Sequence, residues 1–177
     1  MSVWKISLFG VGALFLIAMN LRAQDLQNGL LGHWPLDGNF SDISGNARHA
    51  SLSNANGSHT RFVLGKILKG LDLDGTDDYL SVGHDSGIDL RRTVSFSVWV
   101  KLDTIGTGYT PLIYKGGGGG GGTRTYSLWI QNSNKYFHGT SADSSSQEHA
   151  DSANNAISIS EWFHTVLLVD RLSLIHI

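Results

Sequence analysis

Apolar and polar residues alternate with a period of two along several short stretches of this chain. The clearest stretch runs from Leu71 to Lys101 and reads LDLDGTDDYLSVGHDSGIDLRRTVSFSVWVK. Alternation of this kind is typical of strands that bury one face in an antiparallel sheet. The stretch therefore predicts three short strands and the turns between them, with the Asp77–Asp78 turn closing a hairpin.

The same pattern predicts strands along most of the chain beyond its first two dozen residues. Clusters of Gly, Asn, Asp and Ser separate the apolar runs, and no long run there has the 3.6-residue period of an amphipathic helix. Trp162–Val169 is apolar at nearly every position, which predicts a central strand with both faces covered. The other expected strands are Leu30–Leu36, Phe62–Leu64, Leu71–Asp74, Tyr79–Val82, Val94–Lys101, Leu112–Lys115, Tyr126–Gln131, Lys135–Gly139 and Ile157–Ile159.

Three polar or glycine-rich segments are expected to be loops. Ser41–Thr60 and Ser141–Asn155 are long and polar, and loops of this kind often carry function on a rigid scaffold. Gly116–Gly122 consists of glycine alone, which favours a mobile hairpin loop. A phosphate-binding loop would need Lys and Ser or Thr at a helix start after the glycines, whereas Thr123–Thr125 leads into a predicted strand.

Both ends of the chain are expected to lie outside the folded domain. A short cationic start, an apolar run from Ile6 to Met19 and a small residue at the exit predict a secretory signal peptide over residues 1–23. The alternative is a membrane anchor, but a spanning helix needs about 20 apolar residues. Residues 172–177 equal the translation of the start of a common transposase sequencing adapter, so we expect natural sequence to end near Arg171, the alternative being a genuine apolar terminus.

Composition narrows the class of protein. The chain has 177 residues, enough for one domain after loss of a signal peptide. It has no cysteine, so the core alone must hold the fold. The formal net charge is -2, and basic and acidic residues are mixed without a basic cluster. Binding to nucleic acid, or to a membrane surface by charge, is therefore not predicted.

Five separate motifs of this chain resemble those of the laminin G-like family, within the concanavalin A-like lectin and glucanase superfamily. They are LLGHWPLDG from Leu30, DISGN from Asp42, GTDDYLSV from Gly75, VSFSVWVK from Val94 and EWFHTV from Glu161. The resemblance covers residues 29–171. It implies an all-β fold, a concanavalin A-like sandwich (jelly roll) of two antiparallel sheets. The family pattern normally continues past this point, so the sandwich is expected to lack its closing strand or strands.

The resemblance also implies a function. Such domains are commonly non-catalytic, secreted or cell-surface modules that bind a glycan or another extracellular partner, often with a structural calcium ion. One alternative is a structural spacer or a protein-interaction and adhesion domain with no sugar site. A second is an accessory module of a glycoside hydrolase whose catalytic part lies elsewhere.

Enzymatic activity is not predicted from the residues themselves. Glycosidases usually need two carboxylates about 5–10 Å apart, but Glu148 and Glu161 each lack a carboxylate partner at strand spacing. Asp72 and Asp74 share one face of a predicted strand, yet they lead into a turn. The histidines lie singly, without metal-protease spacing, and His164 is expected to be a hydrogen-bonded structural residue. The serine context of a nucleophile elbow is absent from the sequence.

A calcium site is predicted at the first long turn. Calcium binds several oxygen ligands, which Asp, Asn and backbone carbonyls of a loop can supply. Asp37 and Asp42 flank this turn, near where relatives of the family often hold a metal. The alternative is that both carboxylates only accept hydrogen bonds from turn amides, as aspartates commonly do.

A carbohydrate site would need exposed aromatic side chains. Alternation places Trp129 on the polar face of its strand, opposite Leu128 and Ile130. An indole in that position is costly unless it is used or covered. The candidate ligand-binding residues are Trp129, Gln131, Tyr136 and His138. The alternative is that Trp129 is buried under a loop, and three other tryptophans within the family motifs are expected to pack the scaffold: Trp34, Trp99 and Trp162.

Overall fold

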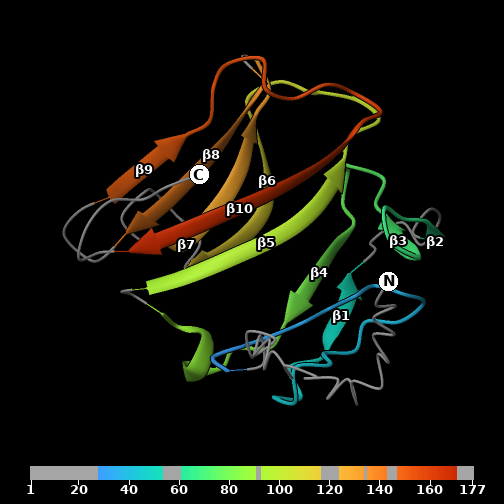
Figure 1. Ribbon diagram of the computed structural model, residues 1–177, viewed down its shortest axis with the longest axis vertical. Helices are drawn as coiled ribbons and strands as arrows, with labels where there is room; N and C mark the ends of the chain where they lie inside the picture. Colours follow the sequence, from blue (N-terminus) through green and yellow to red (C-terminus); the bar gives the residue numbers. More distant parts are fainter. Residues whose placement is uncertain are drawn as a thin grey trace, which may run out of the picture.

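The structure is a computed structural model, and its regular secondary structure consists almost wholly of antiparallel β-strands (Figure 1). It describes residues 28–53, 61–90, 93–116, 124–133, 135–142 and 147–170. A short 3-10 helix spans Ser86–Ile88. The strands are β1 (Ala50–Ser53), β2 (Arg61–Leu64), β3 (Lys69–Asp72), β4 (Tyr79–Val82), β5 (Thr93–Lys101), β6 (Tyr109–Gly116), β7 (Arg124–Gln131), β8 (Tyr136–Ala142), β9 (Gln147–Asp151) and β10 (Trp162–Asp170).

The strands form two main layers and two further two-stranded sheets. One layer is a four-stranded sheet in the order β6-β7-β8-β9, and the other is the pair β10-β5. In Figure 1, β5 and β10 cross in front of the four-stranded sheet. The strand pairs β1-β4 and β2-β3 lie beside these layers. The predicted all-β sandwich of antiparallel sheets is thus confirmed.

The hydrophobic core lies between the two main layers. Leu128 and Ile130 of β7 are fully buried, and they cluster with Leu167 and Val169 of β10. The inward residues of β5 pack on the same cluster, because alternation places Val94, Phe96, Val98 and Val100 on one face. Apolar area removed from water in this cluster stabilises the association of the two layers.

The turn at Asp77–Asp78 does not close a hairpin, contrary to the sequence-based expectation. Strand β3 pairs with β2, and β4 pairs with β1, so residues 73–78 connect two different sheets. Alternation identified both flanking strands correctly. It carries no information on pairing partners, because the period of two is the same in every antiparallel sheet.

Two predicted strands, Leu30–Leu36 and Ile157–Ile159, are not strands in the structure. In the first, side chains bind two of the backbone carbonyls, and no described strand pairs with the segment. Asn46 Nδ2 donates to the Leu30 carbonyl at 2.8 Å, and Arg48 Nη1 donates to the Leu31 carbonyl at 2.7 Å. In the second, Ile157 is buried and its amide donates to the Lys135 carbonyl, outside any ladder.

Two expected loops contain strands instead. Ser41–Thr60 includes β1, and Ser141–Asn155 includes the end of β8 and all of β9. Strand β9 lies at the edge of its sheet, where polar and charged residues are common because they discourage pairing with other chains. Its polar composition therefore concealed it in the sequence.

Strand β10 is covered on one face, not on both as expected. Val166 and Leu168 are 44% and 38% exposed, whereas the residues between them are buried, namely Thr165, Leu167 and Val169. Among the described strands β10 pairs with β5 alone. The apolar residues of its outer face therefore lie in contact with solvent.

Trp99 also faces outwards, so the expectation that it packs the scaffold was wrong. It is 40% exposed on the outer face of β5, where its ring stacks on His164 at 4.8 Å between centroids. Lys66 Nζ lies 5.2 Å from the same indole. His164 Nε2 shares a hydrogen bond of 2.7 Å with Ser97 Oγ, which confirms a hydrogen-bonded histidine. Two further tryptophans are half-buried as expected, Trp34 and Trp162.

Several sequence-based expectations lie outside the described residues. They are the signal peptide over residues 1–23, the glycine segment beyond Gly116 and the terminal hexapeptide 172–177. Within the described part of the chain, no helix has the length and apolar character needed to cross a membrane.

We predict that Leu167→Ala lowers the free energy of unfolding by about 2–5 kcal/mol, because it removes a fully buried side chain from the core. Urea denaturation measures the change. Leu168→Ala is the matched control, since Leu168 is 38% exposed and should cost much less. Equal losses in the two variants would contradict the assignment of the two faces of β10.

Candidate functional site

The four-stranded sheet has a second face, directed away from the core, that we call the aromatic face. It is defined by the residues that alternate with those facing the core and that lie opposite one another across the strands. The aromatic face comprises Tyr109, Pro111 and Tyr114 of β6, Ser127, Trp129 and Gln131 of β7, Tyr136, His138 and Thr140 of β8, and His149 and Asp151 of β9.

A β-bulge in β6 brings both of its exposed tyrosines to this face. Pro111 lies opposite Trp129 and Ile113 lies opposite Leu128, so Leu112 is an extra residue without a counterpart on β7. Because of this extra residue, Tyr109 and Tyr114 point to the same side although five positions separate them. They are 52% and 45% exposed.

The first row across the sheet joins Tyr109, Gln131 and Tyr136. A hydrogen bond between the two tyrosines raises the pKa of the Tyr136 phenol above its ordinary value, and burial and the Asp151 carboxylate raise it further. The Tyr136 phenol therefore stays neutral and able to hydrogen-bond in ordinary buffers. The row presents two aromatic rings and an amide to solvent.

The central row runs from Trp129 through His138 to Asp151. His138 Nδ1 donates to Asp151 Oδ1, which fixes the orientation of the imidazole. The ring of Tyr109 lies 5.3 Å from that of His138, and the ring of His149 lies 5.6 Å from it on the other side. His138 is thus held within a group of aromatic rings at the centre of the face.

The third row explains the position of the Trp129 indole. Ser127 and Thr140 are fully buried at the centre of this row and share a hydrogen bond. The indole N–H of Trp129 donates to Ser127 Oγ at 2.6 Å, so the ring leans over these two hydroxyls. Tyr114 makes an edge-to-face contact with the indole at 5.7 Å between centroids. The hydrogen bond and the ring contact together fix the half-buried indole in place.

The four residues predicted from the sequence, Trp129, Gln131, Tyr136 and His138, therefore lie together on one face. Their role in binding stays a prediction. Among the residues of the face that sequence reasoning did not predict, four carry an aromatic ring, an imidazole or a carboxylate: Tyr109, Tyr114, His149 and Asp151. The first two depend on the bulge, and Tyr109 and Pro111 lie before the predicted strand Leu112–Lys115, which was too short to include them. The other two lie in β9, which had been interpreted as a loop.

Asp42, one of the two predicted calcium ligands, serves as a buried acceptor for a turn. Its Oδ1 accepts from the amides of His33 and Ser44, both at 2.9 Å. Its Oδ2 accepts from the Ser44 hydroxyl at 2.9 Å and from the Arg48 amide at 3.0 Å. This arrangement favours the alternative that the sequence left open, in which the carboxylate binds turn amides. Asp37, the other predicted ligand, is exposed.

These bonds determine the ionisation of Asp42. Burial by itself raises the pKa of the carboxyl group, but the donated hydrogen bonds outweigh burial and hold the pKa well below its ordinary value of 3.8. The carboxylate is therefore charged throughout the neutral and mildly acidic range.

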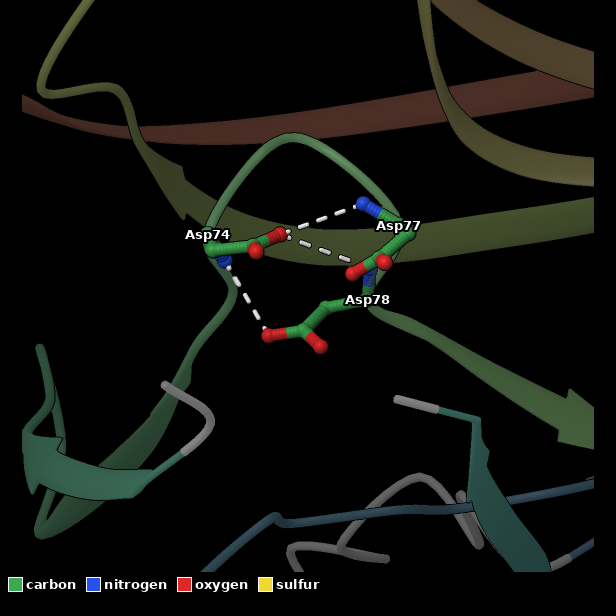
Figure 2. Close-up of side chains that lie close together, drawn as sticks. All are labelled: Asp74, Asp77 and Asp78. Atoms are coloured by element: carbon green, nitrogen blue, oxygen red, sulfur yellow. Dashed lines mark hydrogen bonds between the residues drawn. The ribbon is translucent and has the colours of Figure 1, made fainter. Parts of the chain in front are cut away.

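A second acidic cluster lies in the turn between β3 and β4. Asp74, Asp77 and Asp78 each offer a carboxylate oxygen, and these atoms lie within 4.8 Å of one another (Figure 2). Asp74 Oδ1 accepts from the amides of Thr76 at 2.8 Å and Asp77 at 3.2 Å, which folds the turn around it. Gly75 has a φ of +72°, a backbone conformation that glycine adopts without strain.

The donor set of this acidic cluster fits a divalent cation. Asp77 Oδ1 is buried, and no donor in the described part of the chain hydrogen-bonds to it. Burial, together with the neighbouring charges of Asp74 and Asp78, raises the pKa of Asp77. A hard cation with oxygen ligands, such as calcium, would satisfy this oxygen and relieve the repulsion. The sequence signal was present as three aspartates within DGTDD, but it had been interpreted as a hairpin turn.

Comparison with known families matches residues 74–176, more than half of the chain, to the Laminin_G_3 family, described as the concanavalin A-like lectin/glucanases superfamily. The chain belongs to this family. Laminin G-like domains are generally non-catalytic binding modules and are typically extracellular. No curated protein and no solved structure gives a significant match to the chain.

We predict that Asp42→Asn lowers the free energy of unfolding at neutral pH by on the order of 2 kcal/mol, because it removes a charged acceptor of four hydrogen bonds. The pKa of Asp42 is lower in the folded than in the unfolded state, so this stabilisation is present above the ordinary value of 3.8 and is lost as the pH falls below it.

Denaturation of wild type and variant at a series of pH values measures this difference. It should shrink as the solution is acidified, whereas the exposed control Asp37→Asn should stay close to wild type throughout. A difference that is independent of pH would contradict the role assigned to the Asp42 charge.

Proposed function

We propose that this chain is a secreted, non-catalytic module that binds carbohydrate through the aromatic face. The observation that carries the proposal is the position of Trp129 among the exposed tyrosines of β6 and the histidines of β8 and β9. Membership of a superfamily that includes lectins supports it. Further domains of a longer extracellular protein would supply any catalysis.

The chemistry of the face suits a sugar. The flat, apolar faces of pyranose rings pack against aromatic rings, and their hydroxyl groups need donors and acceptors near the rings. Trp129 and the two exposed tyrosines supply the rings. Gln131, His138 and Asp151 supply the polar groups, and the His138–Asp151 hydrogen bond holds two of these in a defined orientation before a ligand arrives.

A protein-interaction or adhesion domain is the second candidate, and a different surface favours it. The outer face of β5 and β10 exposes Trp99, Val166 and Leu168 side by side with His164. Exposed aromatic and aliphatic groups of this kind are common where proteins meet. A partner bound there would leave the aromatic face of the other sheet unused.

We also propose that Asp74, Asp77 and Asp78 hold a structural calcium ion. The buried oxygen of Asp77 and the proximity of three carboxylates support this site. An ion there would hold together the turn that connects β3 of the β2-β3 sheet to β4 of the β1-β4 sheet. Its role would be structural, since it lies in a different part of the chain from the aromatic face.

We predict that Trp129→Ala abolishes retention of the protein on immobilised glycan, because it removes the central ring of the aromatic face. Glycan-array binding followed by affinity electrophoresis measures the loss. Trp99→Ala is the matched control, because it removes an exposed indole from the opposite layer. Retention that depends on Trp99 and not on Trp129 would move the binding surface to β5 and β10.

For the calcium site we predict a higher melting temperature in calcium than in chelator, since an ion that binds only the folded state stabilises it by about 2.7 kcal/mol at one hundred times its Kd. Asp77→Asn should remove this calcium-dependent shift, and Asp37→Asn should retain it. Loss of the shift in Asp37→Asn alone would place the ion at the first turn. Absence of any shift in the wild type would refute a calcium role.

A further inference from the structure

We infer that the aromatic face binds an internal segment of an extended, uncharged polysaccharide and discriminates against anionic ones. This inference rests on the proposed function and specifies the class of ligand. Two independent properties of the face carry it, namely its charge and its extent.

The charge of the face is the first property. None of the residues that define the aromatic face is a lysine or an arginine, and its one carboxylate is Asp151, whose side chain is 38% exposed. Sulfated and uronate glycans are bound by cationic groups, arginine above all, because these pair with anionic oxygens. A surface whose only fixed charge is negative repels such ligands and accepts hydrogen bonds from neutral hydroxyls.

The lysines nearest to the aromatic face in sequence do not alter this charge. Lys115 lies opposite Tyr126 in the register, on the core side of β6, and its Nζ bonds to His84. Lys135 lies in the turn before β8, beyond the end of the strand, and is exposed. It is therefore outside the rows of the face and serves as a control position.

The extent of the face is the second property. Aromatic or imidazole rings occur on all four strands, from Tyr109 and Tyr114 on β6 to His149 on β9. Neighbouring strands lie about 4.8 Å apart, so the rings span about 14 Å across the sheet. One sugar ring would cover only part of such a surface. Several successive sugars of an extended chain would cover it.

Contacts among the rings make this surface rigid. The Tyr114–Trp129 centroids lie 5.7 Å apart, those of Tyr109 and His138 5.3 Å, and those of Tyr136 and His138 6.4 Å. Rings held in this way lose little further freedom on binding, which favours a ligand that is itself stiff and extended.

The test is affinity electrophoresis of the full chain in gels that contain one soluble polysaccharide each. Hydroxyethylcellulose, galactomannan and dextran are the neutral probes, and alginate, polygalacturonate and heparin are the anionic ones. We expect retardation by at least one neutral probe and by none of the anionic probes. We expect Lys135→Ala to behave as wild type.

Tyr114→Ala tests whether the ligand extends across the aromatic face, because Tyr114 lies at the edge of that face. With the neutral probe that binds, we expect this variant to lose about two- to tenfold in affinity, the value of one aromatic contact. Equal affinity of wild type for disaccharide and polymer would overturn the inference of an extended chain.

The outcomes separate this inference from the proposed function. Retardation by an anionic polysaccharide that is lost in Trp129→Ala would overturn the inference of a neutral ligand while leaving glycan binding in place. A wild-type chain that folds cooperatively and is retarded by none of the six probes would overturn glycan binding itself, and the inference with it.

Discussion

The burial of Leu128 and Ile130 between the two layers is the constraint on which the candidate site depends. Both side chains are fully enclosed, so the intervening residues of β7 must point to the opposite side of the sheet. The same alternation that builds the core thus places Trp129 on the outer face, where it is half-buried. A shift of one residue in the register of β7 would turn its core residues to the surface and its surface residues to the core. Core packing therefore determines which residues lie on the aromatic face.

Two aspartates show how the local donors decide what a buried carboxylate does. Asp42 is surrounded by four donors, which keep it ionised and make it the acceptor that organises a turn. Asp77 faces other carboxylates, and one of its oxygens is buried without a hydrogen-bond donor among the described residues. The hydrogen bonds to Asp42 compensate the charge of its carboxylate. The Asp77 cluster could still bind a cation.

The sequence predicted the strands whose alternation is strong, and with them the class of fold. Tyr79–Val82 has the predicted bounds, and β5, β7 and β10 differ from prediction by one or two residues at their ends. Pairing was less predictable, because alternation reports which face is buried and not which strand lies alongside. Leu30–Leu36 has a strand-like sequence, yet side chains bind its Leu30 and Leu31 carbonyls and no described strand pairs with it.

Within the candidate site, too, some residues could be predicted from the sequence and others could not. Trp129, Gln131, Tyr136 and His138 were accessible from the sequence because they lie on regular, alternating strands. Tyr109 and Tyr114 were not, since only pairing reveals the bulge between them. His149 and Asp151 were concealed in a serine-rich segment whose composition resembles a loop.

The bulge at Leu112 also determines which sequence changes the face tolerates. Its extra residue lets the two halves of β6 alternate in opposite phase while their tyrosines share one side. Deletion of the extra residue would place the two halves in one phase and leave the tyrosines four positions apart, so both would still point to the aromatic face. The side to which the tyrosines point therefore depends on how each half of β6 pairs with β7 and not on the exact length of the strand, and related chains that keep the face can have either the bulge or a strand shorter by one residue.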